Sequence, residues 1–376
     1  MELSSEDSFR LNVLLANRPQ AIRIDESRMI VYGLSEKGEA KVPLNPVGRA
    51  ESYLRAVKEL ISGHVLGSPG GYPVYLRRWT RLGQMRDESL EQLLMLGEPE
   101  AVVAAVGSPG LSDELARRAW WAMEDAGNAR RMLANPTVVA GSMGPTLAAY
   151  LIDYLPFETE PEQIMASVRL VLQPGLIDAE QRKELWQKSS RKQAYLVGFL
   201  QAIPDDLPEQ VSARPDAARL EAALGSAIAD DNPDARLLLR IAGAPGQTFL
   251  KTVAAVLAKP PTQEVVTATF DLLRNYFADL RPEGDPDLTL DALVADAEAY
   301  VHDATAASEV RDCCRLLPEI APQLAAIRLL SGLGYGVIRP LLPDPTTLGS
   351  LMRRKLEPVN DVLQDRIKLL QTTVGA

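Results

Sequence analysis

The sequence predicts a mainly α-helical protein of stacked helical hairpins, with irregular repeats of the HEAT or armadillo sort and a small N-terminal β-hairpin or meander. Composition is the first observation: 46% of the residues are hydrophobic but only 5% are aromatic. The abundant Ala and Leu favour helices over strands. The second observation is an internal echo, in which two apolar residues precede Gly-Ser at Gly67, Gly107 and Gly141. Its spacings of 40 and 34 residues suit a helical-pair repeat.

Residues 1–45 are predicted to contain the hairpin or meander. The runs 21–25 and 29–34 are rich in residues that favour strands, and 40–44 follows the turn-like sequence Glu-Lys-Gly-Glu at 36–39. Because a lone hairpin is barely stable in water, we expect it to pack on helices.

The helical part is predicted to comprise a repeat unit at 46–210 and an acidic, Ala-rich unit at 211–376. A chain of 376 residues is long enough for two packed units. The boundary is placed between Pro204 and Pro215, because the passage there is polar and bracketed by prolines. Each glycine of the echo is expected to take the left-handed conformation that closes a helix, and the following serine to cap or turn the next segment.

Charge is divided unevenly along a chain whose formal net charge is -10. Residues 1–200 carry 23 Lys or Arg against 25 Asp or Glu, net -2, and residues 201–376 carry 17 against 25, net -8. We therefore expect no general attraction of the whole surface to nucleic acid or to an anionic membrane, and any such contact to be local. Between 279 and 303, eight acids accompany Arg281 alone, and we expect them to form a solvated face.

Signals for a membrane or for export are missing from the sequence. No run approaches the ~20 apolar residues that span a bilayer, and the N-terminus lacks the basic start and apolar run of a signal peptide. We therefore expect a cytoplasmic protein. The sequence leaves its oligomeric state open.

Residues that carry chemistry are scarce. With two histidines and no Cys-x-x-Cys, we expect no metal, no cofactor and no catalytic site. The two cysteines, Cys313 and Cys314, are adjacent and predicted to be reduced. They form a possible thiol site, because Arg311 and Arg315 nearby can lower a thiol pKa. Burial of small residues on a helix also explains the two cysteines, and that interpretation is favoured.

A basic, aromatic segment is the strongest candidate contact site. Between Glu59 and Asp87 the chain has no acidic residue. Basic patches interleaved with aromatic residues suit an anionic partner, which is either a protein or RNA. The predicted contact residues are Tyr72, Tyr75, Arg77, Arg78, Trp79, Arg81 and Arg86.

The run from Tyr75 to Met85, continued from Ser89 to Trp121, resembles the DsrS family. These are soluble cytoplasmic proteins encoded with the reverse dissimilatory sulfite reductase system of sulfur-oxidising bacteria. The resemblance extends to about Leu207 and implies an accessory or regulatory role in the oxidation of stored sulfur, with no active-site residues to transfer. The sequence thus predicts a non-enzymatic scaffold that binds proteins of that machinery. Two alternatives stay open: an RNA-binding post-transcriptional regulator, and a sulfur-handling protein that uses Cys313 or Cys314.

Overall fold

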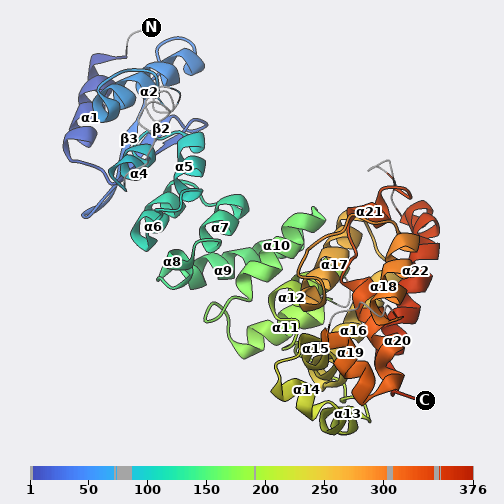
Figure 1. The fold of residues 1–376 in the computed structure, drawn as a ribbon. Helices are drawn as coiled ribbons and strands as arrows, with labels where there is room; N and C mark the ends of the chain where they lie inside the picture. Colours follow the sequence, from blue (N-terminus) through green and yellow to red (C-terminus); the bar gives the residue numbers. More distant parts are fainter. Residues whose placement is uncertain are drawn as a thin grey trace. The chain divides into compact units, whose positions relative to one another are not determined.

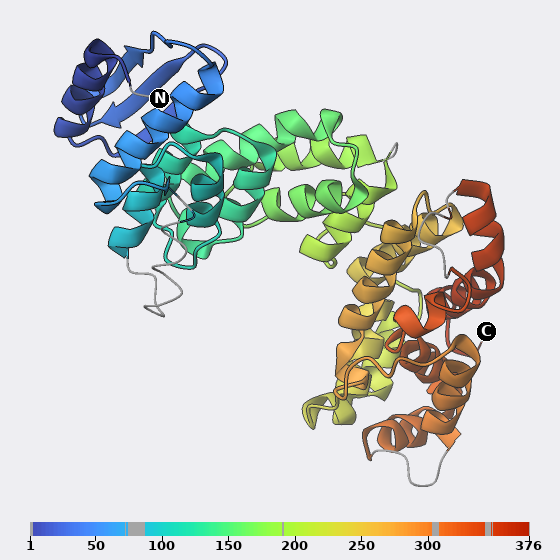
Figure 2. The same ribbon diagram turned by 90° about the horizontal axis from the view of Figure 1, so that it is seen from above.

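The computed structural model describes residues 3–71, 73, 87–189, 192–302, 308–342, 347 and 349–375. Over these residues the chain is mainly helical, with one small antiparallel sheet near the N-terminus (Figures 1 and 2). The predicted fold class is confirmed at this level. The chain divides into two compact units: the first comprises Met1–Pro156 with Gln173–Ile177, and the second comprises Phe157–Leu172 with Asp178–Ala376.

The first unit begins with a helix and a three-stranded meander. Helix α1 (Ser5–Ala16) is followed by β1 (Ala21–Asp25), β2 (Ile30–Ser35) and β3 (Gly38–Pro43). The strands are antiparallel in the order β1-β2-β3. The predicted meander is confirmed. Helix α1 was not expected, although Leu11, Leu14 and Leu15 have helical spacing and are buried.

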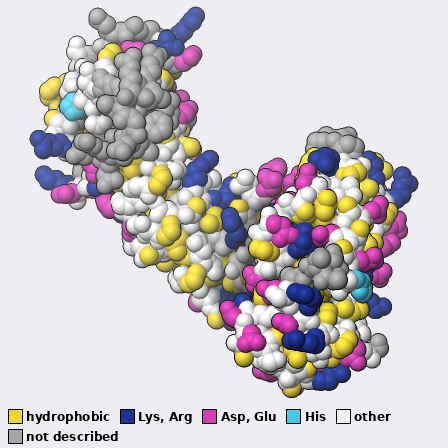
Figure 3. Space-filling view, in the orientation of Figure 1, with side chains coloured by type: hydrophobic (Ala, Val, Ile, Leu, Met, Phe, Trp, Pro, Cys, Tyr) yellow, Lys and Arg dark blue, Asp and Glu magenta, His cyan; other side chains and the backbone are white. Residues whose placement is uncertain are grey.

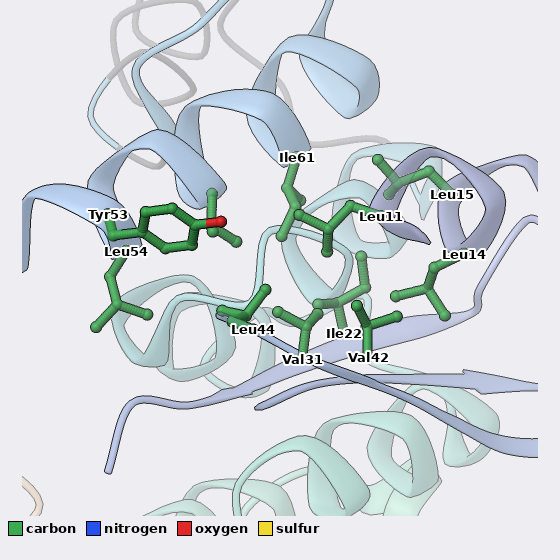
Figure 4. Packing of buried hydrophobic residues seen from close by; sticks show 11 residues of the cluster. Leu11, Leu14, Leu15, Ile22, Val31, Val42, Leu44, Tyr53, Leu54 and Ile61 are labelled. Carbon is green, nitrogen blue, oxygen red and sulfur yellow. The ribbon is translucent and has the colours of Figure 1, made fainter. Parts of the chain in front are cut away.

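Helix α1 and helix α2 (Ala50–Leu66) pack on one face of the sheet, and their apolar side chains point toward the strands (Figure 4). Gly33 permits the close approach of α1, because a Cβ there would lie 2.8 Å from Leu14 Cδ1. The Tyr53 hydroxyl donates to Asp7 Oδ2 at 2.5 Å, and the Asn45 N–H donates to the same oxygen at 2.7 Å. Burial opposes ionisation of Asp7, but these hydrogen bonds outweigh it and lower its pKa.

Short helices complete the first unit. They are α4 (Asp87–Leu94), α5 (Pro99–Val106), α6 (Asp113–Ala122), α7 (Ala126–Leu133), α8 (Pro136–Val139) and α9 (Met143–Tyr154), followed by the 3-10 turn η1 (Leu155–Phe157). Helices α7 and α9 pack together, and α6 contacts β1.

The echoed glycines all lie at helix ends, but only one behaves as predicted. Gly67 ends α2 with a left-handed φ of 68°, whereas Gly107 ends α5 with a φ of -82°. Gly141 lies between α8 and α9 without a positive φ. Because Gly141 has no side chain, the Asp113 carboxylate can lie against it. Asp113 Oδ2 accepts from Ser142 N at 2.9 Å and from Ser142 Oγ at 2.8 Å. Ser142 is the N-cap residue of α9, but its side chain makes no cap hydrogen bond, because a carboxylate from α6 holds the start of α9 instead.

The second unit is entirely helical where it is described. Its helices are α10 (Pro161–Val171), α11 (Ala179–Ser189), α12 (Gln193–Ala202), α13 (Ala217–Ala223), α14 (Gly225–Ala229), α15 (Pro233–Ala242), α16 (Ala244–Ala258), α17 (Gln263–Tyr276), η2 (Ala278–Leu280), α18 (Leu290–His302), α19 (Ser308–Leu316), η3 (Pro318–Ile320), α20 (Ala321–Leu330), α21 (Tyr335–Ile338) and α22 (Gly349–Gln371). The pairs α10 with α12, α18 with α20, and α20 with α22 pack closely. None of the helices in the described part is both long and apolar enough to cross a membrane.

The predicted boundary near residue 210 lies inside the second unit. Helix α12 packs against α16 and α17, so α10 to α12 belong with the helices that follow them. The polar passage before Pro215 is itself tied down, since Val211 N donates to Thr248 Oγ1 at 3.0 Å and Arg214 N donates to Ala242 O at 2.8 Å.

The acidic run at 279–303 is partly neutralised by arginines. Asp296 accepts from Arg281 at 2.5 Å and from Arg328 at 3.1 Å, and Asp285 accepts from Arg274 at 3.0 Å. Arg281 is only 3% exposed. Of the acids in this run that the structure describes, only Asp296 is not exposed, so the expected solvated face is wrong for Asp296 and confirmed for the others. On the face of the second unit shown in Figure 3, acidic and basic side chains lie interspersed.

Candidate functional site

The predicted contact segment falls between two described helices of the first unit. Its residues Tyr72, Tyr75, Arg77, Arg78, Trp79, Arg81 and Arg86 lie outside the described residues. The chain before it is anchored on α2, where Ser62 Oγ donates to Ser68 O at 3.1 Å and accepts from Gly71 N at 2.7 Å. The chain after it begins α4 at Asp87.

The face of the sheet opposite α1 carries a cluster of arginine and aromatic side chains. Arg23 on β1 lies opposite Tyr32 on β2, and cross-strand partners point to the same face. The Arg23 guanidinium carbon lies 4.7 Å from the centre of the Tyr32 ring and 4.9 Å from that of Trp121, which comes from α6. Glu39 Oε2 accepts from Trp121 Nε1 at 3.0 Å and from Arg23 Nη2 at 3.3 Å. We call these four residues the Arg23 cluster.

All four side chains of the Arg23 cluster are accessible, because Glu39 is exposed and the other three are half-buried. Cation–π contact and the shared carboxylate hold the guanidinium in one orientation. The cluster therefore presents two partly accessible aromatic rings and an oriented cation on one face of a sheet. Sequence reasoning missed Arg23 and Tyr32, since their only signal was alternation along two predicted strands.

The neighbouring basic pair on α6 is neutralised within its own helix. Arg117 and Arg118 both donate to Glu114, at 2.7 Å and 2.9 Å. The hydrogen bond from Arg117 and that from Arg118 lower the pKa of Glu114 to about 2. Trp120 beside them is 9% exposed and packs edge-on against Tyr150, with 4.8 Å between the ring centres. This pair supports the helix and its core more than it offers charge to a ligand.

The predicted thiol site lies on α19 in a buried polar setting. Cys313 is 0% exposed, and its Sγ donates to Asn232 Oδ1 at 3.7 Å. Burial, together with the nearby Asp234 carboxylate, raises the pKa of Cys313 to about 12. Burial likewise raises the pKa of the half-buried Cys314. The lowering expected from Arg311 and Arg315 does not occur, because desolvation of the thiols dominates.

We expect iodoacetamide to alkylate Cys314 before Cys313 in the folded protein, with both thiols slower than in urea. Only the thiolate reacts, and burial disfavours it at both positions. Mass spectrometry of the peptide that contains both residues, with fragment ions that separate them, measures the order. Alkylation of Cys313 first would contradict the burial that the structure shows.

A buried carboxyl group lies beside the thiols. Asp234 on α15 is 1% exposed, and the Tyr300 hydroxyl donates to its Oδ2 at 3.1 Å. The Arg328 guanidinium carbon lies 4.8 Å from the centre of the Tyr300 ring. Burial raises the pKa of Asp234 to about 6, with a further contribution from Glu309, while Tyr300 and Arg328 act in the opposite direction. Burial also raises the pKa of Tyr300.

The Asp234 carboxyl group makes the stability of the second unit depend on pH. Its pKa is about 6 in the folded chain against an ordinary 3.8, so between these values the folded state binds more protons. The contribution of Asp234 to stability therefore falls by about 3 kcal/mol as pH rises through this window. Asp234→Asn is expected to remove most of that loss, and to be more stable than the wild type at about pH 8 but not at about pH 4.

Urea unfolding at both pH values measures this difference. Asp291→Asn on α18 is the control, because it makes the same substitution at an exposed position. Parallel pH profiles for the wild type and Asp234→Asn would show that Asp234 ionises normally.

Among the described residues, no group of three or more His, Cys, Asp or Glu side chains is placed to hold a metal ion. Comparisons of the chain with protein-family models, with curated proteins and with solved structures find no match.

Proposed function

We propose that the protein is a non-enzymatic helical scaffold that assists the cytoplasmic oxidation of stored sulfur through protein–protein contacts. The contact part of the proposal is carried by the Arg23 cluster. Trp, Tyr and Arg are the residues that contribute most binding energy at protein interfaces. Here they are held in place before a partner arrives, which reduces the entropy lost on binding. The sulfur-oxidation part rests on the resemblance of residues 75–121 to the DsrS family.

The segment 72–86 is proposed to act together with the Arg23 cluster. It has the same composition of Tyr, Trp and Arg, and the helices on either side of it, α2 and α4, belong to the same unit. A HEAT- or armadillo-like repeat remains a proposal for the helical body. It is supported by the close pairing of α7 with α9, α10 with α12, and α18 with α20, and by the echoed glycines at helix ends.

RNA binding is the less favoured alternative for the Arg23 cluster. Aromatic rings and an arginine on a sheet can stack bases. However, Glu39 already accepts hydrogen bonds from Arg23 and Trp121, so a phosphate would have to displace a carboxylate that repels it. Sulfur handling is disfavoured at Cys313, because its raised pKa keeps the thiol protonated.

Affinity capture from cells grown on reduced sulfur tests the proposal. We expect the wild-type protein to retain proteins encoded with the reverse dissimilatory sulfite reductase system, and Tyr32→Val to lose most of that retention. Valine preserves the strand propensity at this position but removes the ring. Retention of RNA that falls steeply with salt would instead support the alternative.

Tyr335→Val is the matched control. Tyr335 is also a tyrosine with an arginine over its ring, Arg339 at 5.9 Å, but it lies on α21 in the second unit and is 55% exposed. Its replacement should leave retention unchanged. Equal retention by the wild type and by both variants would contradict the assignment of the contact to the Arg23 cluster.

A further inference from the structure

Among the described residues, no strand pairs with the outer edge of β3. β3 is the last strand in the order β1-β2-β3, and all of its residues except Val42 are exposed. Such an edge presents unpaired backbone N–H and C=O groups, which are a template for another strand. In the part of the chain that the structure describes, β3 has no backbone hydrogen bond to any strand other than β2.

Pairing with β2 determines which backbone groups of β3 point outward. Leu44 N donates to Met29 O at 2.8 Å, so these two residues form a hydrogen-bonded pair. Ala40 lies four residues before Leu44 in the same register, so it also forms a hydrogen-bonded pair with β2. Hydrogen-bonded and non-hydrogen-bonded pairs alternate along an antiparallel ladder. Ala40 therefore bonds inward, while Glu39 and Lys41 direct their N–H and C=O groups outward.

These outward residues are self-complementary. If two β3 strands pair antiparallel about a twofold axis at Ala40, Glu39 lies opposite Lys41 of the second copy, and Lys41 lies opposite Glu39. Shifting one strand by two residues along the other keeps the same backbone groups facing each other. It places Glu39 opposite Glu39 in one direction, or Lys41 opposite Lys41 in the other. Opposite charges stabilise such cross-strand pairs and like charges destabilise them. Charge therefore selects the register centred on Ala40.

We propose that two copies of this chain associate through their β3 edges, joining the two sheets into one continuous antiparallel sheet. Glu39 of each copy exchanges both backbone hydrogen bonds with Lys41 of the other. Ala40 meets Ala40 in a non-hydrogen-bonded pair, where strands approach to about 4.5 Å between Cα atoms and a small side chain fits. The backbone of Pro43 also faces the open edge, but proline has no N–H to donate, so the pairing ends there.

Helix α1 packs on β3, and a twofold axis perpendicular to the joined sheet places both copies of α1 on the same face. Its exposed apolar side chains, Phe9 and Val13, lie on the side of α1 opposite the buried Leu11, Leu14 and Leu15, so they point away from the strands. The contact therefore rests on the strands. Two short strands bury less than the roughly 1,200 Å² of a standard interface, so we expect dissociation in the micromolar range. This association does not depend on the proposed function.

Sedimentation velocity of the full chain between about 1 and 500 μM tests the proposal. The wild type should change from monomer to dimer across this range. Lys41→Pro removes an outward N–H without breaking a bond to β2, and should weaken association at least tenfold with an unchanged circular dichroism spectrum. A wild type that stays monomeric throughout, or a Lys41→Pro variant that dimerises like the wild type, would overturn the proposal.

Charge substitutions test the register independently of proline. Lys41→Glu places Glu opposite Glu39 and should weaken the dimer several-fold. Adding Glu39→Lys in the same chain restores opposite charges in both pairs and should recover most of the affinity. The double variant also loses the contacts of Glu39 with Arg23 and Trp121, so its thermal unfolding is measured in parallel. Identical dissociation constants for the single and the double variant would exclude the register centred on Ala40.

Discussion

Replacing Arg214 by methionine is expected to lower the free energy of unfolding by about 3 to 5 kcal/mol. Arg214 is 3% exposed, and its Nε donates to Asp216 Oδ1 at 2.6 Å. Its Nη1 donates to Gln323 Oε1 at 3.0 Å and to Leu370 O at 3.1 Å. The variant leaves the carboxylate of Asp216 buried without its cation, which costs more than the lost hydrogen bonds alone.

The same network ties down the C-terminal end of the chain. Asp216 Oδ2 accepts from Val374 N at 2.8 Å, so α13, α20 and the end of α22 meet at one buried ion pair. Urea unfolding measures the loss. Arg236→Met is the matched control, because Arg236 pairs with Asp231 at the surface and should cost less than about 1 kcal/mol. Equal losses for the two variants would mean that the buried pair contributes no more than a surface one.

Replacing Phe249 by alanine is expected to cost about 3 to 5 kcal/mol. Phe249 on α16 is 0% exposed and stacks on Tyr276 of α17, with 3.7 Å between the ring centres. The far face of Tyr276 meets Arg240, whose guanidinium carbon lies 3.8 Å from the ring centre. Truncation therefore opens a cavity under a stack that joins three helices.

Phe249→Leu is the control for the cavity. It keeps most of the volume and should cost less than about 1.5 kcal/mol. Both variants are compared with the wild type by urea unfolding at neutral pH. A loss for Phe249→Ala no larger than that for Phe249→Leu would contradict the tight packing of this stack.

Local features of the fold were predictable from sequence. Strand-favouring runs on either side of a turn gave the meander, and α8, α10 and α15 begin at prolines because proline fits the first helical turn. The unit boundary was not predictable. It depends on the packing of α12 against α16 and α17, and the periodicity of one helix does not say which distant helix it will meet.

The surroundings of the candidate site residues could not be predicted from sequence, because spacing along the chain does not show which side chains are in contact. Arg311 and Arg315 are each two residues from Cys313, but residues two apart on a helix do not face each other. Asn232 and Asp234, which set the environment of this thiol, come from a distant part of the chain. The Arg23 cluster was missed for the same reason, since Trp121 reaches Arg23 from α6.

The most direct test of the central claim is the rate at which stored sulfur disappears in cells that lack the native protein and carry a variant. Contact through the basic, aromatic segment predicts that Cys313→Ala with Cys314→Ala restores the rate, while Arg77→Glu with Arg78→Glu does not. Arg353→Glu with Arg354→Glu reverses the same charge on another arginine pair and should restore it. If the cysteine variant fails and the Arg77 and Arg78 variant succeeds, the protein acts through its thiols and the scaffold account is wrong.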